Sequence, residues 1–191
     1  LLAQRLDVAP DDLLAADLNL VPRQKAVRLG PEGEYLAAPR IDDLECAWAT
    51  LLGFLSGPED SPAAWCLLDH EEVGSGSRQG AQSDFVQAVL TRAILAQGGD
   101  AQHAAQAVAG SFALSADNAH ARHPNFPEVS DKTANVVLNG GVVLKYAASQ
   151  KYTTDGLTGA VFTELMRRAD IRFRCTPTGP TSPAAARWAT C

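Results

Sequence analysis

The sequence D-H-E-E at residues 69–72 is the densest group of residues that could perform chemistry. Carboxylates bind divalent metals and act as general bases. The apolar run at residues 65–68 predicts a buried strand just before them, and ligands of open α/β sheets bind beyond the carboxyl ends of strands. Glu71 and Glu72 serve one site only if the backbone bends, which the Gly-Ser turn at residues 74–77 permits. The alternative interpretation is a solvated acidic loop.

A second group of metal-competent residues follows another predicted strand, at residues 111–115. It contains Asp117, His120 and His123 in a D-x-x-H-x-x-H string. This string is weak evidence by itself, because short clusters of His and Asp also occur in ordinary loops. Its position after a strand matches that of Glu71 and Glu72, so we expect the two strand ends to converge.

Asp42 and Asp43 form a third acidic position, at the start of a predicted helix. An apolar stripe with the period of a helix follows them from Leu44 to Leu55. Aspartate is a favoured N-cap residue and complements the helix dipole, so capping alone could explain the pair. A role in a functional site is the other interpretation.

The rest of the chain alternates predicted helices with predicted strands. Helices are expected at residues 82–97 and 100–110, and a third is expected to be capped by Thr153, Thr154 or Asp155. Further predicted elements are a hairpin around residues 30–33 and strands at 17–21, 111–115, 136–138 and 142–146; Lys145 lies in the last of these. This alternation is typical of an α/β layered domain.

Composition narrows the class of protein. A chain of 191 residues with 46% hydrophobic residues can form one domain, and its net charge of −6 argues against a surface for nucleic acid or an anionic membrane. No apolar run is long enough to span a bilayer. The four cysteines show no C-x-x-C spacing or disulfide framework, which favours a reducing compartment, and we expect the cytoplasm.

Five motifs together resemble the aspartyl aminopeptidases, a family of dinuclear-zinc exopeptidases. They are A-P-R-I-D-D (residues 38–43), D-H-E-E-V-G-S (69–75), G-A-Q-S (80–83), S-A-D-N-A-H-A-R-H-P-N (115–125) and G-V-V-L-K-Y (141–146), in the family's order. The resemblance implies a partial three-layer α/β/α catalytic domain with a central mixed sheet. It also implies cleavage of N-terminal residues, Asp or Glu above all, from peptides, and a homo-oligomer at full length.

The resemblance also implies roles for individual residues. Asp42 matches the carboxylate that bridges two zinc ions, Glu72 the ligand of one zinc and Asp117 the ligand of the other. Glu71 matches the general base that takes a proton from the attacking water. Residues matching positions that contact the substrate are Glu71, Asp117, His120, Lys145 and Tyr152.

The sequence departs from the family at both ends. The family's metal centre needs one histidine far upstream and one near the C-terminus, and none of the four histidines stands in either motif. The chain starts without Met, and the family's inserted subunit-contact domain is missing. We therefore expect an incomplete catalytic domain at residues 1–171, truncated upstream, inactive or nearly so alone and weak in zinc affinity.

Residues 172–191 resemble nothing in the family and show no regular period, so they are expected to form an unstructured tail. DNA that encodes residues 178–190 can read N-R-A-D-I-P-G-G-S-T-L-G-N after a shift of one base, which resembles the family's own segment here. We hypothesise a frameshift near Ile171 or Arg172. The DNA sequence tests it, because codons incompatible with the shifted reading would exclude it.

Two other functions stay open at this stage. A related dinuclear-zinc peptidase or deacylase would have a different side-chain preference, because residues 21–26 differ from the family's usual pattern. A non-catalytic subunit that retains the fold is the alternative from another class. The retention of four acids, Asp42, Glu71, Glu72 and Asp117, argues against such a scaffold.

Overall fold

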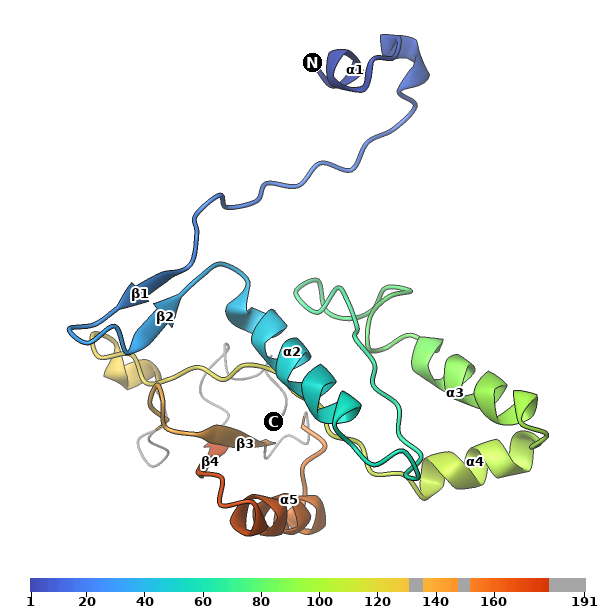
Figure 1. Cartoon of the computed structure of the whole chain (residues 1–191), viewed down its shortest axis with the longest axis vertical. Coiled ribbons are helices and arrows are strands. Elements are labelled where there is room, and N and C mark those ends of the chain that lie inside the picture. The colour runs from blue at the N-terminus through green and yellow to red at the C-terminus, as the bar shows by residue number, and fades with distance from the viewer. Residues whose placement is uncertain (131–135, 148–151, 179–191) are drawn as a thin grey trace. The chain divides into compact units, whose positions relative to one another are not determined.

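The computed structural model describes residues 1–130, 136–147 and 152–178, and the chain divides into two compact units, 1–40 and 41–191 (Figure 1). The first unit contains α1 (Leu2–Leu6), the 3-10 helix η1 (Pro10–Asp12) and the antiparallel strands β1 (Val27–Leu29) and β2 (Tyr35–Ala37). Gly30 and Gly33 take the positive φ values that the turn between the strands requires, 93° and 66°. The predicted hairpin is confirmed.

The second unit carries the candidate site. Its elements are α2 (Ile41–Leu55), α3 (Phe85–Ala96), α4 (Ala101–Ala109), η2 (Pro127–Val129), β3 (Val142–Ala147), α5 (Gly156–Arg168) and β4 (Phe173–Thr178). The predicted helices are confirmed, with α3 starting three residues later than expected. Asp100 and Asp155 cap α4 and α5 by accepting hydrogen bonds from the backbone N–H groups of His103 and Thr158.

Strands β3 and β4 pair in parallel, and the alternation of side chains gives β3 two different faces. Leu144 and Tyr146 face α5, where Tyr146 lies against Gly159 and Leu144 lines a pocket with Phe162. Lys145 points to the opposite face, toward Asp117. The strand therefore separates a face packed by a helix from a face that carries the charged groups.

Strand β4 lies in the stretch predicted to be an unstructured tail, and for residues 173–178 that prediction is wrong. Phe173 packs edge-to-face on Phe162 of α5, with ring centroids 6.3 Å apart. A ladder of backbone hydrogen bonds to a neighbouring strand depends little on the side-chain period, so the sequence pattern missed it. Residues 179–191 of the predicted tail lie outside the described residues.

Four of the predicted strands are absent from the described residues: 17–21, 65–68, 111–115 and 136–138 have no regular secondary structure. Those predictions were wrong because an apolar run becomes a strand only where a neighbour completes its hydrogen-bond ladder. Backbone hydrogen bonds that these stretches form within the described residues are isolated ones, such as the one from the Arg122 N–H to the Val136 carbonyl at 2.8 Å.

The apolar stripes of the helices also differ from expectation, because most of their side chains are exposed. Trp48 of α2 is 63% exposed and Leu157 of α5 is 74% exposed, whereas Phe162 of α5 is buried. The α/β class itself is confirmed by the mixture of helices with a parallel strand pair. No helix among the described residues has both the length and the apolar character that crossing a membrane requires.

Candidate metal centre

The start of α2 brings two acidic side chains toward one point. Asp42 and Asp43 have non-helical backbone angles, and the regular helix continues only after them. Carboxylate oxygens of Asp42, Asp43 and Asp117 lie within 4.8 Å of one another. The departure from helical geometry matters because neighbouring residues of a regular helix do not face each other.

A buried lysine neutralises part of this three-carboxylate group. Lys145 is 4% exposed, and its Nζ donates to Asp117 Oδ2 at 3.3 Å and to the Asn118 carbonyl at 2.9 Å. Burial and the neighbouring Asp42 and Asp43 raise the pKa of Asp117, while Lys145 opposes that rise. One ammonium therefore faces three carboxylates.

Asn118 connects the Asp117 segment to α2. Its amide Nδ2 donates to Glu45 Oε2 at 3.1 Å, and its backbone N–H bonds to Asp43. The Cys46 thiol also donates to Asp43; burial and the adjacent Asp43 raise the pKa of that thiol to about 12. Burial nevertheless dominates and raises the pKa of Asp43. Within the described part of the chain, Asp43 Oδ1 and Asn118 Oδ1 are buried without a hydrogen-bond partner.

The loop that carries Glu71 and Glu72 bends as predicted. His70 and Gly74 have positive φ values of 60° and 99°, and the Gly74 N–H donates to the Glu71 carbonyl at 2.8 Å. His70 Nδ1 lies 2.7 Å from Ser77 Oγ and closes the loop. Both glutamates are therefore carried by a tight turn.

Electrostatics indicates that this loop approaches the three-carboxylate group. Glu71 is exposed overall, yet its pKa is raised, first by partial burial and then by the charges of Glu72, Asp117, Asp42 and Asp43, in that order. The loop is tied to α2 upstream, where Trp65 Nε1 donates to Thr50 Oγ1 at 3.0 Å. Three separate segments of the second unit thus deliver acids to one region.

The sequence-predicted residues fall into distinct groups. Asp42, Asp117 and Lys145 lie together, and Glu71 and Glu72 interact with each other electrostatically. Glu72 is not part of the three-carboxylate group within 4.8 Å. His120 is exposed, and the Tyr152 side chain is 2% exposed. From the sequence no ligand role was predicted for Asp43, which the structure places in the same group. Its position next to Asp42 was the sequence feature that could have indicated this.

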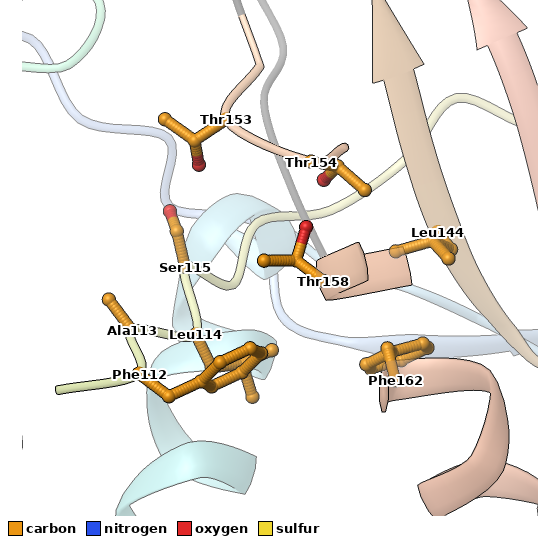
Figure 2. A pocket seen from close by; sticks show the side chains of 9 residues that line it. All are labelled: Phe112, Ala113, Leu114, Ser115, Leu144, Thr153, Thr154, Thr158 and Phe162. Atoms are coloured by element: carbon orange, nitrogen blue, oxygen red, sulfur yellow. The ribbon is translucent and has the colours of Figure 1, made fainter. Parts of the chain in front are cut away.

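A pocket lies on the other face of β3 from Lys145. It has a volume of about 390 Å³, including space open to solvent. Figure 2 shows the hydroxyl-bearing side chains on one side and the large apolar ones on the other; the lining residues are Phe112, Ala113, Leu114, Ser115, Leu144, Thr153, Thr154, Thr158 and Phe162. The pocket is therefore separate from the three-carboxylate group, although Ser115 is only two residues from Asp117.

The donor set fits a divalent cation. Carboxylate oxygens are ligands of zinc and of harder divalent ions. Three carboxylates against one ammonium leave an excess of negative charge, and a bound cation would relieve the repulsion that, after burial, raises the pKa of Asp117 and Glu71. The buried and unpartnered Asp43 Oδ1 adds an acceptor at the same place.

Comparison with known proteins identifies the family to which the chain is similar. The family described as "Aminopeptidase I zinc metalloprotease (M18)" matches residues 1–185. A probable M18 family aminopeptidase 2 of Clostridium novyi (strain NT) is 38% identical over 171 residues, which cover 89% of this chain and 40% of that protein. The chain therefore spans about two fifths of this curated relative.

Solved structures agree. The crystal structure of yeast aminopeptidase 1 matches with a TM-score of 0.76 and 31% identity, over 97% of this chain and 44% of that one. The S. cerevisiae mApe1 dodecamer matches with a TM-score of 0.68 and 31% identity, over 85% and 39%. The chain belongs to the M18 family of zinc metallo-aminopeptidases.

Proposed function

We propose that this chain is the metal-binding part of a dinuclear-zinc aminopeptidase that releases N-terminal Asp or Glu from peptides. The observation that carries the proposal is the group formed by Asp42, Asp43 and Asp117, in which Asp117 pairs with the buried Lys145; the charges of the three aspartates also act on Glu71. In this proposal Asp42 would be shared by two zinc ions, Glu72 would hold one of them and Asp117 the other. Family membership supports zinc, and the pairing of ions is our inference.

Bound zinc would supply Lewis-acid polarisation of the scissile carbonyl and would lower the pKa of water. The proton transfers of the reaction are carried out by a residue of this chain. Glu71 takes a proton from the attacking water as its oxygen adds to the carbonyl carbon, and gives that proton to the leaving amine nitrogen as the C–N bond breaks. Partial burial raises the pKa of the Glu71 carboxyl, and a higher pKa makes its carboxylate a stronger base for this exchange.

Substrate recognition follows from charge. The negative potential of Glu71 and Asp117 would attract the free α-ammonium group that every aminopeptidase substrate carries. Lys145 would attract the carboxylate of an acidic first side chain. His120 and Tyr152 complete the proposed substrate contacts by resemblance alone. We further propose a cytoplasmic enzyme that forms a homo-oligomer at full length; the dodecamer of a similar protein supports the oligomer.

The test is hydrolysis of aspartyl, glutamyl and leucyl 4-nitroanilides with zinc present. Because the chain spans two fifths of its relative, the assay uses the chain and also a chimera in which it replaces the matching stretch of the Clostridium novyi protein. We expect little turnover by the chain alone, and preferential cleavage of the two acidic substrates by the chimera. A folded chimera that prefers leucine, or cleaves nothing, would contradict the proposal.

The base is tested separately. Glu71→Gln in the chimera should lower kcat by about 10²- to 10⁴-fold while zinc binding is retained, because Glu71 is not a ligand. Glu59→Gln, in the exposed loop after α2, is the matched control and should leave kcat unchanged. Full activity of Glu71→Gln would remove Glu71 from the mechanism.

A further inference from the structure

Lys145 uses two different partners, and only one of them is a proposed zinc ligand. Its Nζ donates to Asp117 Oδ2 at 3.3 Å and to the Asn118 carbonyl at 2.9 Å. The Lys145 and Asp117 side chains are 5% and 16% exposed, so solvent screens this ion pair poorly. The pair forms between β3 and the segment after residue 115, which lie 28 residues apart in the chain.

The same carboxylate cannot serve an ammonium and a divalent cation without cost. A positive charge beside the ligand oxygen repels a second cation, and the repulsion is large where solvent is excluded. We propose that Lys145 acts as an internal counter-cation that competes with metal for Asp117, and that metal binding displaces its ammonium from Asp117 Oδ2. This inference rests on the proposed function.

Displacement from Asp117 would leave the Lys145 ammonium free to bind a different acceptor. The bond to the Asn118 carbonyl does not involve the ligand oxygen, so it can hold the ammonium near the site after Asp117 is taken by the metal. The donor capacity released from Asp117 then becomes available to an acidic substrate side chain. Metal loading and recognition of an acidic residue would thus be coupled through one amine.

The test measures zinc affinity of the whole 191-residue chain by competition with a chelating dye. Lys145→Met removes the charge, and Lys145→Gln removes the charge but keeps a donor. We expect both to bind zinc about tenfold more tightly than the wild type, because a repelling charge has gone. Arg168→Met removes a cation that pairs with Glu164 on the exposed face of α5, and should leave the affinity unchanged.

Unchanged or weaker affinity in the lysine variants would overturn the competition. A loss of about 10- to 100-fold would instead make Lys145 a positioning residue that orients Asp117 for the metal. If circular dichroism shows that neither lysine variant folds, the proposal is tested on the unmodified chain instead. Labelling of Lys145 by an amine reagent, mapped by mass spectrometry, should increase when zinc is added; no increase would overturn the proposal.

A separate variant distinguishes this failure from failure of the proposed function. Asp117→Asn should lower zinc affinity whether or not Lys145 competes for the carboxylate. If Asp117→Asn binds zinc like the wild type, the proposed metal centre is wrong. If Asp117→Asn loses affinity but Lys145→Met does not gain it, only the role of Lys145 is wrong.

Discussion

Gly159 of α5 has no side chain where the hydroxyl end of Tyr146 lies. A Cβ at this position would meet Tyr146 Oη directly and would come within 2.8 Å of Tyr146 Cζ. Tyr146 follows Lys145 on β3, so a displaced tyrosine ring would also disturb the strand that carries the lysine. A single glycine therefore sets how closely α5 approaches β3.

Gly159→Ala should destabilise the chain by about 1–3 kcal/mol, the usual cost of overpacking. The measurement is the urea midpoint of unfolding. Gly156→Ala is the matched control in the same helix, because a Cβ there meets nothing within 4 Å. Equal midpoints for the two variants would show that Tyr146 moves aside freely.

At the scale of single residues, the sequence predicted that Asp42, Glu71, Glu72 and Asp117 converge; the structure brings Asp42 and Asp117 together, with Lys145 bonded to Asp117, and leaves Glu72 outside that group. Asp117 follows an apolar run and Lys145 lies in one, and polar residues in such places are few enough to be singled out; Asp42 instead stands just before the apolar stripe of α2. Asp43 was missed as a member of the group, because a helix start explains two adjacent aspartates by capping alone. Its carboxylate joins the group because the backbone departs from helical geometry at this point, and the sequence pattern does not predict such a departure.

Helices α4 and α5 begin with the same reciprocal cap. Asp100 accepts from the His103 N–H at 2.9 Å, and Asp155 accepts from the Thr158 N–H at 2.8 Å. Thr158 Oγ1 completes the second cap by accepting from the Asp155 N–H at 2.9 Å, and it donates to Asp155 Oδ1 at 2.7 Å. Hydrogen bonds from the backbone and then the hydroxyl of Thr158 lower the pKa of Asp155 from its ordinary 3.8.

The lowered pKa predicts how the cap depends on pH. A carboxyl whose pKa is lower in the folded than in the unfolded chain stabilises the fold above the unfolded value, and this stabilisation is lost as the pH falls through the folded value. Asp155→Ala should therefore lower Tm by a few degrees at neutral pH, and the difference from wild type should shrink below pH 3.8. Thermal unfolding followed by circular dichroism at several pH values measures this.

Asp60→Ala, in the loop between α2 and α3, is the control for loss of a carboxylate. It should leave Tm close to that of the wild type. A difference between wild type and Asp155→Ala that stays constant from neutral pH to below pH 3.8 would mean that the ionised carboxylate contributes nothing to the cap.

Helices were predicted from the sequence more completely than strands: the hairpin and the strand at residues 142–146 are present, but four other predicted strands are not, and the reason is the range of the interactions. The cap at Asp155 and the apolar period of α5 are local, and both lie within one turn or a few turns of chain. A strand depends on a neighbour that is distant in sequence. Residues 111–115 read as a buried strand but have no ladder among the described residues, whereas residues 173–178 read as irregular and pair with β3.

The second unit exposes much apolar surface. Trp48 and Leu55 of α2 are 63% and 69% exposed, and Leu157 of α5 is 74% exposed. Apolar surface on this scale usually marks an interface or a partner element. The sequence showed the stripes correctly, but a stripe does not specify what covers it.

The 191-residue chain should therefore bind the dye ANS under native conditions, measured by its fluorescence. Trp48→Gln should reduce the signal, because it removes a large exposed ring. Ala49→Gln, also exposed on α2, is the control and should leave the signal unchanged. No dye fluorescence above that of a compact reference protein would contradict the exposure.

The two-sided character of β3 has a consequence for folding. Slipping β3 by a single residue against β4 would exchange its faces, placing Leu144 among the carboxylates and forcing the Lys145 ammonium beneath α5. Both placements would be unfavourable. Leu144 among the carboxylates would leave them without a neutralising cation, and Lys145 beneath α5 would bury an unpaired charge in apolar surroundings. Correct alignment of β3 and formation of the three-carboxylate group beside Lys145 therefore depend on the same register, so misaligned chains would be unstable and would also lack the candidate metal centre.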